Sequence, residues 1–140
     1  MEITLIKLQE EHLPFLLEVR NDESTRSMLE NDQVFTLEQC TAWFKSLTDP
    51  WYIIQNSAQE KVGYLRVKDN QVGCDIHPQH RRNGYARKAY TEYLKDKTYS
   101  ELWVFEDNFA KHLYTSLGFK ENGNFKIIRN RKYIEMIWKS

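Results

Sequence analysis

The chain has 140 residues and carries 20 basic against 20 acidic side chains, so its formal net charge is zero. Aromatic residues make up 14%, and there are only five glycines and three prolines, a composition that excludes disordered, collagen-like and low-complexity chains. No apolar run is long enough to span a membrane, and the length predicts a single domain over residues 1–140.

The start of the chain and its cysteines bear on the compartment in which it works. Residues 1–4 lead directly into a predicted strand, without the basic and apolar stretches of a signal peptide. Cys40 and Cys74 are too few to form a disulfide framework. We therefore expect a cytoplasmic protein in a reducing environment.

In the first 50 residues the hydrophobic pattern predicts one strand followed by helices. Apolar and polar residues alternate over residues 3–8, which indicates a strand, and residues 10–20 place apolar side chains at helical spacing. A short helix is expected around residues 25–29. Thr36 and Gln39 then match a capping box, so a helix should begin there and end near residues 49–50.

From Trp51 onward the pattern changes to short β-rich runs. Residues 51–55, 62–67 and 71–76 predict an antiparallel meander of three strands. A helix over residues 84–95, a strand over 101–105 and a helix over 108–117 follow. The last helix should stop at Gly118, because glycine readily adopts the left-handed conformation of a helix end. Residues 119–138 are predicted to form two strands around Asn130.

The segment between residues 76 and 88 is the most informative for chemistry. A strand ends near residue 78 and a helix begins near Gly84, and amides at a helix N-terminus attract anions. Gly84 leaves room for a phosphate to approach the backbone. Arg81, Arg82 and Arg87 add positive charge, and no acid lies between residues 76 and 92. The loop is therefore predicted to bind an anionic ligand.

Three motifs resemble those of the GNAT family of N-acetyltransferases. The run RRNGYA at residues 81–86 resembles the Arg/Gln-x-x-Gly-x-Gly/Ala loop with which this family binds the pyrophosphate of acetyl-CoA. The run IHP at residues 76–78 resembles the Val-x-Pro that closes the family's fourth strand. Residues 110–119, AKHLYTSLGF, resemble its Ala-x-x-x-Tyr-x-x-x-Gly-Phe helix.

Together with the order of predicted elements, this resemblance covers nearly the whole chain. It implies an α+β (α/β/α) fold, with a mixed, mostly antiparallel sheet of about seven strands flanked by helices. It also implies direct transfer of an acetyl group from acetyl-CoA to a primary amine in a ternary complex.

The implied reaction assigns roles to particular residues. The amine must lose a proton, and the nearest carboxylates along the chain are Asp75 and Glu106. Backbone amides around Ile76 would stabilise the oxyanion, and Tyr114 occupies the position of the family's general acid, which protonates the leaving thiolate. We therefore expect Tyr114, Asp75 and Glu106 to be catalytic.

The expected acetyl-CoA site contains one departure from the family pattern. The family usually places Asn three residues before the alanine that opens its Tyr-bearing helix, and Asp107 holds that position here, followed by Asn108. Either Asn108 takes over the contact, which we favour, or an acid stands where an amide is usual. The predicted ligands of acetyl-CoA are Ile76, His77, Arg81, Arg82, Asn83, Gly84, Tyr85, Ala86, Arg87, Asn108 and Lys111.

A metal site is the alternative use of this segment. Cys74, His77 and His80 are spaced three residues apart and carry zinc-binding side chains. A fourth ligand is not apparent, and the spacing lacks the usual pairing of zinc ligands. We therefore expect no metal cofactor.

The acceptor is predicted from a further resemblance. Arg20, Asn21, Arg26 and residues 36–44 are similar to the early region of the branch that includes ribosomal-protein amino-terminal acetyltransferases and enzymes that acetylate nucleotide-linked amino sugars. Because the chain is short, without an insertion to hold a peptide, a small amine such as an amino sugar is favoured. A protein amino terminus is the alternative. We expect a monomer or a homodimer.

Two functions of other classes compete with this one. The chain could be a non-catalytic CoA-binding regulatory module, although such a chain would more readily have lost Tyr114 and its nearby carboxylates. The basic loop could also bind nucleic acid, which the zero net charge argues against. We expect neither nucleic acid nor a membrane as a partner.

The zero net charge conceals two opposed parts of the chain. Residues 1–50 carry ten acids and four bases, and residues 51–140 carry ten acids and sixteen bases. The basic part holds the anion-binding loop. The acidic part is expected to border the acceptor and to attract a cationic amine.

Overall fold

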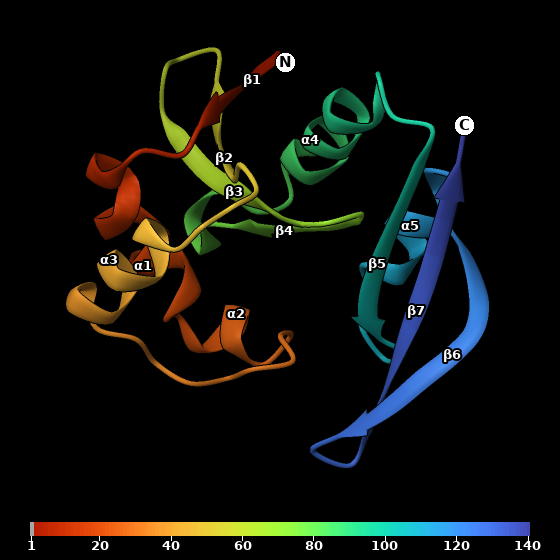
Figure 1. Cartoon of the computed structure of the whole chain (residues 1–140). Coiled ribbons are helices and arrows are strands. Elements are labelled where there is room, and N and C mark those ends of the chain that lie inside the picture. The colour runs from red at the N-terminus through yellow and green to blue at the C-terminus, as the bar shows by residue number, and fades with distance from the viewer. Residues whose placement is uncertain (1) are drawn as a thin grey trace.

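The computed structural model describes residues 2–140 and contains a mixed seven-stranded sheet with helices on both faces (Figure 1). Its strands lie in the order β1-β2-β3-β4-β5-β7-β6, and every neighbouring pair is antiparallel except β4 with β5. This is the α+β fold that the motifs implied. The strands are β1 (Ile3–Lys7), β2 (Tyr52–Asn56), β3 (Lys61–Lys68), β4 (Gln71–Ile76), β5 (Tyr99–Phe105), β6 (Lys120–Ile128) and β7 (Arg131–Lys139).

Helices α1 and α3 pack against one face of the sheet, and α4 and α5 pack against the other. None of the helices in residues 2–140 has the length and apolar character that crossing a bilayer demands. The helices are α1 (Leu13–Arg20), α2 (Glu23–Arg26), α3 (Leu37–Lys45), α4 (Tyr85–Leu94) and α5 (Lys111–Ser116), with 3-10 turns η1 (Glu10–His12) and η2 (Pro78–His80).

Two neighbouring residues of β2 show how the sheet separates two hydrophobic cores. Successive side chains of a strand point to opposite faces, so Ile53 packs with α1 and α3 whereas Ile54 packs with α4. Both cores extend over several elements and bury large apolar side chains, which stabilises the frame of the sheet. The core beneath α4 and α5 includes Val62, Leu65, Val72, Ala89, Tyr90, Leu94, Leu102, Val104, Phe119, Ile134 and Met136.

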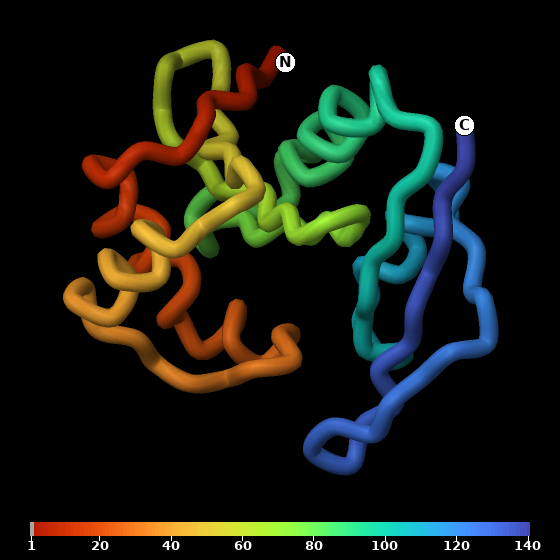
Figure 2. Tube along the Cα trace, viewed as in Figure 1, coloured from red at the N-terminus to blue at the C-terminus, as the bar shows by residue number. Residues whose placement is uncertain are grey.

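Strands β4 and β5 meet at one point and then separate. Their ladder is the single pair Gln71 with Glu101, beside which the Glu101 N–H donates to the Asn70 carbonyl at 2.8 Å. Among the residues described, no other pair joins these strands, so the edge of β4 that faces β5 has no strand partner toward Ile76. The opening divides the sheet into a β1–β4 part and a β5–β7 part, on the left and right of Figures 1 and 2.

Three helix boundaries in the first 50 residues differ from their predictions. The helix predicted over residues 10–20 starts as the 3-10 turn η1 and becomes α-helical only at Leu13, because Pro14 has no N–H to bond back to residue 10. The short helix expected around residues 25–29 lies earlier, at α2, because the Asp22 carboxylate accepts from the Ser24 N–H at 3.0 Å and caps it. Helix α3 ends at Lys45 rather than near residue 49. The amides of residues 46 and 47 form 3-10 hydrogen bonds, which close its last turn.

The predicted capping box at the start of α3 is confirmed. The Gln39 N–H donates to the Thr36 hydroxyl at 3.1 Å, and the Thr36 N–H donates to the Gln39 side chain at 2.9 Å. The two bonds satisfy amides that the helix itself leaves unpaired, so this boundary could be located from local sequence alone.

Helix α5 starts later than predicted and ends as predicted. It begins at Lys111 rather than at residue 108, because the Asn108 side chain accepts from the Ala110 N–H at 2.9 Å and forms a turn. At its end, Gly118 has φ +104°, and the Phe119 N–H donates to the Tyr114 carbonyl at 3.0 Å. This is the glycine-ended Schellman motif, and it fixes the C-terminal turn of the helix that carries Tyr114.

Candidate active site

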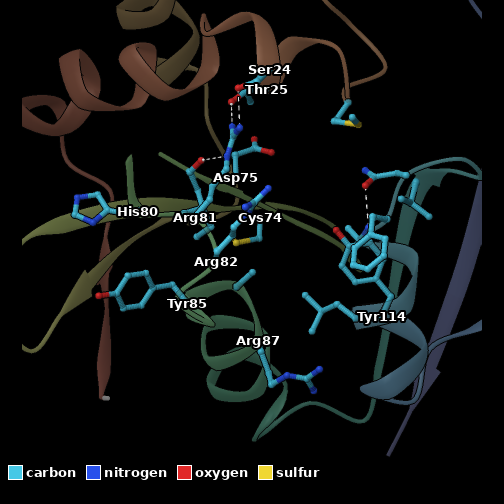
Figure 3. A pocket seen from close by; sticks show the side chains of 18 of the residues that line it. Ser24, Thr25, Cys74, Asp75, His80, Arg81, Arg82, Tyr85, Arg87 and Tyr114 are labelled. Atoms are coloured by element: carbon cyan, nitrogen blue, oxygen red, sulfur yellow. Dashed lines mark hydrogen bonds between the residues drawn. The ribbon is translucent and has the colours of Figure 1, made fainter. Parts of the chain in front are cut away.

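A cavity of about 720 Å³ opens where β4 and β5 separate, and we refer to it as the large cavity (Figure 3). Its walls come from the end of β4, the loop and first turn of α4, β5, the start of α5, and α2. The volume lies in the range of about 300–1,000 Å³ that small-molecule sites occupy. The predicted site residues in its wall are Asp75, Ile76, Arg81, Arg82, Gly84, Tyr85, Ala86, Arg87, Asn108 and Tyr114.

The first turn of α4 forms one end of the large cavity. Gly84 is the N-cap of this helix and has φ +77°, a left-handed conformation that favours glycine. A Cβ built on Gly84 would have no atom within 4 Å, so the space beside this backbone is open. Arg82 and Arg87 are also in the wall. The helix N-terminus and the two guanidinium groups together form a site suited to a phosphate.

Arg81 holds this loop in place through its side chain. Its Nε donates to the Ile76 carbonyl at 3.1 Å, and its two terminal nitrogens donate to the hydroxyls of Ser24 at 2.7 Å and Thr25 at 3.0 Å (Figure 3). The guanidinium therefore joins the loop to β4 and to α2, so it positions the loop. The two hydroxyl partners lie 57 and 56 residues away in the chain, so no local motif indicates them.

On the facing wall, Tyr114 of α5 is joined to Tyr90 of α4. The Tyr90 hydroxyl donates to the Tyr114 hydroxyl at 3.3 Å, and the rings meet edge to face with centroids 5.4 Å apart. Burial raises the pKa of Tyr114 to about 12, and the hydrogen bond from Tyr90 opposes that rise. Tyr114 is therefore a neutral phenol at physiological pH, with a proton that it can donate.

Tyr90 also belongs to this site, although no motif in the sequence indicates it. Its only signal is helical spacing with Ala89 and Leu94, and all three are buried in the core beneath the sheet. That pattern indicates packing. The contact with Tyr114 depends on how α4 and α5 meet, which no local motif records.

Asp75 lies at the end of β4, only 9% exposed, and forms an ion pair with Arg66 of β3. The Arg66 Nε lies 3.0 Å from the Asp75 Oδ2. The pair depends on Gly73, which faces Arg66 across the two strands, because a Cβ at Gly73 would come within 2.4 Å of the guanidinium carbon. Tyr64, the cross-strand neighbour of Asp75, has a buried hydroxyl without a hydrogen-bond partner among residues 2–140. Asp75 is therefore held at the opening by a partner that the sequence did not reveal.

Two of the predicted residues, Glu106 and His77, are placed elsewhere. Glu106 is not in the wall of the large cavity, and its carboxylate lies 3.6 Å from the Lys132 ammonium at the surface. His77 is also outside the wall, because its Nε2 lies 2.9 Å from the Glu18 carboxylate on α1. Of the two predicted carboxylates, Asp75 lies in the wall and Glu106 does not, and the roles expected for Glu106 and His77 stay predictions.

Asn83 and Lys111 also lie outside the wall, because their side chains are used within the protein. The Asn83 amide donates to the carbonyls of His80 at 3.0 Å and Arg81 at 3.3 Å, which shapes the loop from inside. The Lys111 ammonium lies 2.9 Å from the Glu121 carboxylate. The structure thus gives Asn83 a structural role and Lys111 a partner on β6.

Asp107 and Asn108 differ in where each side chain lies. Asp107 accepts from Arg131 of β7 at 2.8 and 3.2 Å, and these hydrogen bonds lower the pKa of its carboxyl. Asn108 is in the wall of the large cavity. A contact of Asn108 with acetyl-CoA therefore stays a prediction that agrees with its position.

The spacing of Cys74, His77 and His80 does not produce a metal centre. Within residues 2–140, no three or more His, Cys, Asp or Glu side chains are grouped so that they could hold a metal ion. Burial raises the pKa of the Cys74 thiol far above its usual range, so this side chain remains protonated. Cys74 and His80 instead line the large cavity.

A second cavity, of about 290 Å³, lies beside the first, and we refer to it as the small cavity. Arg66 and Trp103 line both cavities, so the two meet at the opening between β4 and β5. The other walls of the small cavity come from α1, residues 29–31, Trp51, β3, β4, β6 and β7. The opening therefore has access from two sides.

Comparisons with known proteins agree with this geometry. Residues 16–140 match the sequence model of the acetyltransferase (GNAT) domain. The fold is similar to that of spermidine N-acetyltransferase from Vibrio cholerae, solved with CoA and spermine, with a TM-score of 0.90 and 18% identity over 99% of this chain and 95% of that one. It is also similar to yncA from Salmonella typhimurium, solved with its cofactor acetyl-CoA, with a TM-score of 0.76 and 19% identity over 99% and 94%. No curated protein sequence matches.

Proposed function

Because this chain belongs to the GNAT acetyltransferase family, we propose that it transfers the acetyl group of acetyl-CoA to a primary amine of a small molecule, with an amino sugar, free or nucleotide-linked, as the favoured acceptor. One observation carries this proposal: the anion-binding turn at Gly84 and the neutral phenol of Tyr114 line the same cavity. The proposal includes a single catalytic domain and a cytosolic location.

Acetyl-CoA binding is assigned to the large cavity. Its pyrophosphate would lie against the first turn of α4, near Arg82 and Arg87, where backbone amides and positive charge coincide. The Salmonella typhimurium yncA structure, which holds acetyl-CoA in a similar fold, supports this assignment. The thioester would then extend toward the ends of β4 and β5, where Asn108 is in the wall.

The oxyanion of the reaction would form beside the open edge of β4. The His77 N–H donates to the Val62 carbonyl at 2.8 Å, on the β3 side. Because amides alternate in direction along a strand, the Ile76 N–H points to the other side, toward the opening. A donor already aimed at a developing negative charge stabilises it without reorganisation. This supports the oxyanion role proposed for Ile76.

The proton steps are assigned to the two ends of the site. Tyr114 would donate its proton to the CoA thiolate as the carbon–sulfur bond breaks, and the Tyr90 hydroxyl would stabilise the phenolate that this leaves behind. Asp75 would take the proton of the attacking ammonium, directly or through a water. Glu106 is set aside as the base because it lies outside the wall of the cavity.

The experiment that tests the function measures release of free CoA by the purified protein with a panel of amines. The panel holds glucosamine, a nucleotide-linked amino sugar, spermidine, and a short peptide with a free amino terminus. We expect turnover with the amino sugars. Turnover with the peptide alone would favour amino-terminal acetylation, and binding of CoA by calorimetry without turnover on any amine would identify a non-catalytic CoA-binding module.

A further inference from the structure

The small cavity carries more positive than negative charge. Its wall holds the cationic side chains of Arg20, Arg66, Lys68 and Lys126 and the carboxylate of Glu30. Asp75, at the junction with the large cavity, adds one further carboxylate beside Arg66. The wall therefore keeps an excess of positive charge after both carboxylates are counted.

The hydrogen bonds of this wall show which cations lack an anionic partner. Arg66 is paired with Asp75, and the Lys126 ammonium lies 3.1 Å from the Glu30 carboxylate. Arg20 donates only to neutral groups, the carbonyls of Asn31 at 2.6 Å and Gln33 at 3.1 Å. Lys68 has no ion pair within the part of the chain that the structure describes.

The same wall offers flat aromatic surface next to these charges. The Trp103 ring stacks on Tyr133 with centroids 5.5 Å apart, and the Lys126 ammonium lies 4.7 Å above the Trp103 ring. Trp51 closes another part of the wall. A ligand here would therefore contact aromatic side chains as well as positive charge.

Size and position restrict the ligand further. A volume of about 290 Å³ lies at the lower end of the range for small-molecule sites, about 300 Å³, so it accommodates a single sugar or amino acid. Arg66 and Trp103 line both cavities, and Asp75, the ion-pair partner of Arg66, lies in the wall of the large one. The reacting amine would lie near Asp75, with the rest of the molecule behind it.

We propose that the small cavity binds the acceptor and selects amines that carry an anionic group, a carboxylate or a phosphate, at the end remote from the amine. The anionic group lies near Lys68 and Arg20, the body of the molecule contacts Trp103 and Tyr133, and the amine points past Arg66 toward Asp75. This inference rests on the proposed function and narrows its acceptor class. A polyamine, which places positive charge at both ends, is disfavoured.

The proposal also replaces the acidic rim that the charge of residues 1–50 led us to expect. Of the acids in that part, only Glu30 is in the wall of the small cavity, and it is paired with Lys126. Asp32 lies 3.6 Å from the Arg129 guanidinium. Glu30 and Asp32 thus form ion pairs with basic residues of the β6–β7 hairpin.

The test compares amines that differ only in the anionic group. The pairs are glucosamine 6-phosphate against glucosamine, and glutamate against its dimethyl ester, with spermidine as the polycation. We expect kcat/KM to be at least tenfold higher for one or both anionic members, because a charged hydrogen bond adds about that factor. Their KM should rise with salt, since a partly exposed ion pair is screened.

Two charge-neutralising variants place the effect in the small cavity. Lys68→Gln should raise KM for the anionic amine by about threefold to tenfold, and Lys126→Gln should raise it less, because Lys126 is already paired with Glu30. Both variants should leave the Kd of CoA unchanged. Lys139→Gln removes an equal charge from an exposed position outside both cavities and should change neither constant. The phosphate and carboxylate members show which anion is preferred.

Equal kcat/KM within both pairs, or a preference for spermidine, would overturn the proposal while leaving the acetyltransferase function intact. If no amine is turned over, calorimetry on the CoA-loaded protein tests the anion site directly. Binding of glucosamine 6-phosphate but not of glucosamine would support the proposal. Binding of neither overturns it. Failure of the proposed function is recognised separately, because it abolishes turnover with every amine in the panel.

Discussion

The large and small cavities meet at one opening in the sheet, but they are built in different ways. Most residues in the wall of the large cavity come from two short stretches of the chain, residues 74–87 and 103–114. The small cavity gathers side chains from α1, β3 and the β6–β7 hairpin, which are far apart in the chain. A site made from contiguous segments leaves a motif in the sequence, whereas a site made from distant side chains does not.

The hairpin shows how distant segments shape the small cavity. Arg129, in the β6–β7 turn, donates to the carbonyls of Leu29 at 2.6 Å and Glu30 at 2.9 Å. Arg131 donates to the Ser27 carbonyl at 2.7 Å. These bonds join the segment after α2 to the hairpin, whose turn lies at the bottom of the view in Figure 2. The small-cavity side of the opening is therefore shaped by residues about 100 positions apart in the chain.

Variants of the large cavity should change kcat or the Kd of CoA. The largest effect is expected for Tyr114→Phe. Loss of the proton donor should lower kcat about 10²-fold and leave the Kd of CoA unchanged. Steady-state kinetics and calorimetry measure the two constants. Tyr99→Phe is the matched control, because its hydroxyl bonds Glu101 at 2.8 Å outside both cavities. An unchanged kcat in Tyr114→Phe would remove the acid role.

A smaller effect, on binding alone, is expected for Gly84→Ala. Gly84 and Gly123 both have positive φ, +77° and +91°, and open space where a Cβ would lie. Each alanine should therefore lower the free energy of unfolding by about 1–2 kcal/mol, which chemical denaturation measures. Only Gly84→Ala should also weaken CoA binding, by about tenfold, because it alters the anion-binding turn. Equal CoA affinity in both variants would contradict the assignment of that turn.

Tyr90→Phe should have a weaker effect, on the proton donation that is assigned to Tyr114. Removing the hydroxyl that donates to Tyr114 should lower kcat about fivefold, the equivalent of one neutral hydrogen bond of about 1 kcal/mol. In the Tyr114→Phe background the same substitution should have no further effect on kcat, because its partner is gone. A double-mutant cycle measures this coupling, and additive effects would mean that Tyr90 acts by packing alone.

The smallest effect is expected for Arg129→Lys, on the side of the small cavity. Lysine keeps the charge but cannot hold both carbonyls of residues 29 and 30 in the same fixed geometry. KM for the acceptor should rise about threefold, and the Kd of CoA should not change. A parallel loss of CoA affinity would show that the two cavities do not bind their ligands independently.

Part of the site could be predicted because its determinants are local. The glycine at the N-terminus of α4, the basic loop before it and the Schellman motif after Tyr114 each depend on a few consecutive residues. The same holds for the capping box at Thr36 and Gln39. Such features follow from backbone hydrogen bonding within one turn, so the residue types alone indicate them.

The sequence by itself thus determined the order of elements, the family resemblance and the segments that form the large cavity. Only the tertiary structure decided that Asp75 lies in the wall and Glu106 does not, that Tyr90 contacts Tyr114, and that Gly73 makes room for Arg66. It also showed that a chain of zero net charge has a small cavity whose wall carries more basic than acidic side chains. The physical reason is that charge pairing and side-chain contact depend on distance in space, which the spacing along a chain does not encode.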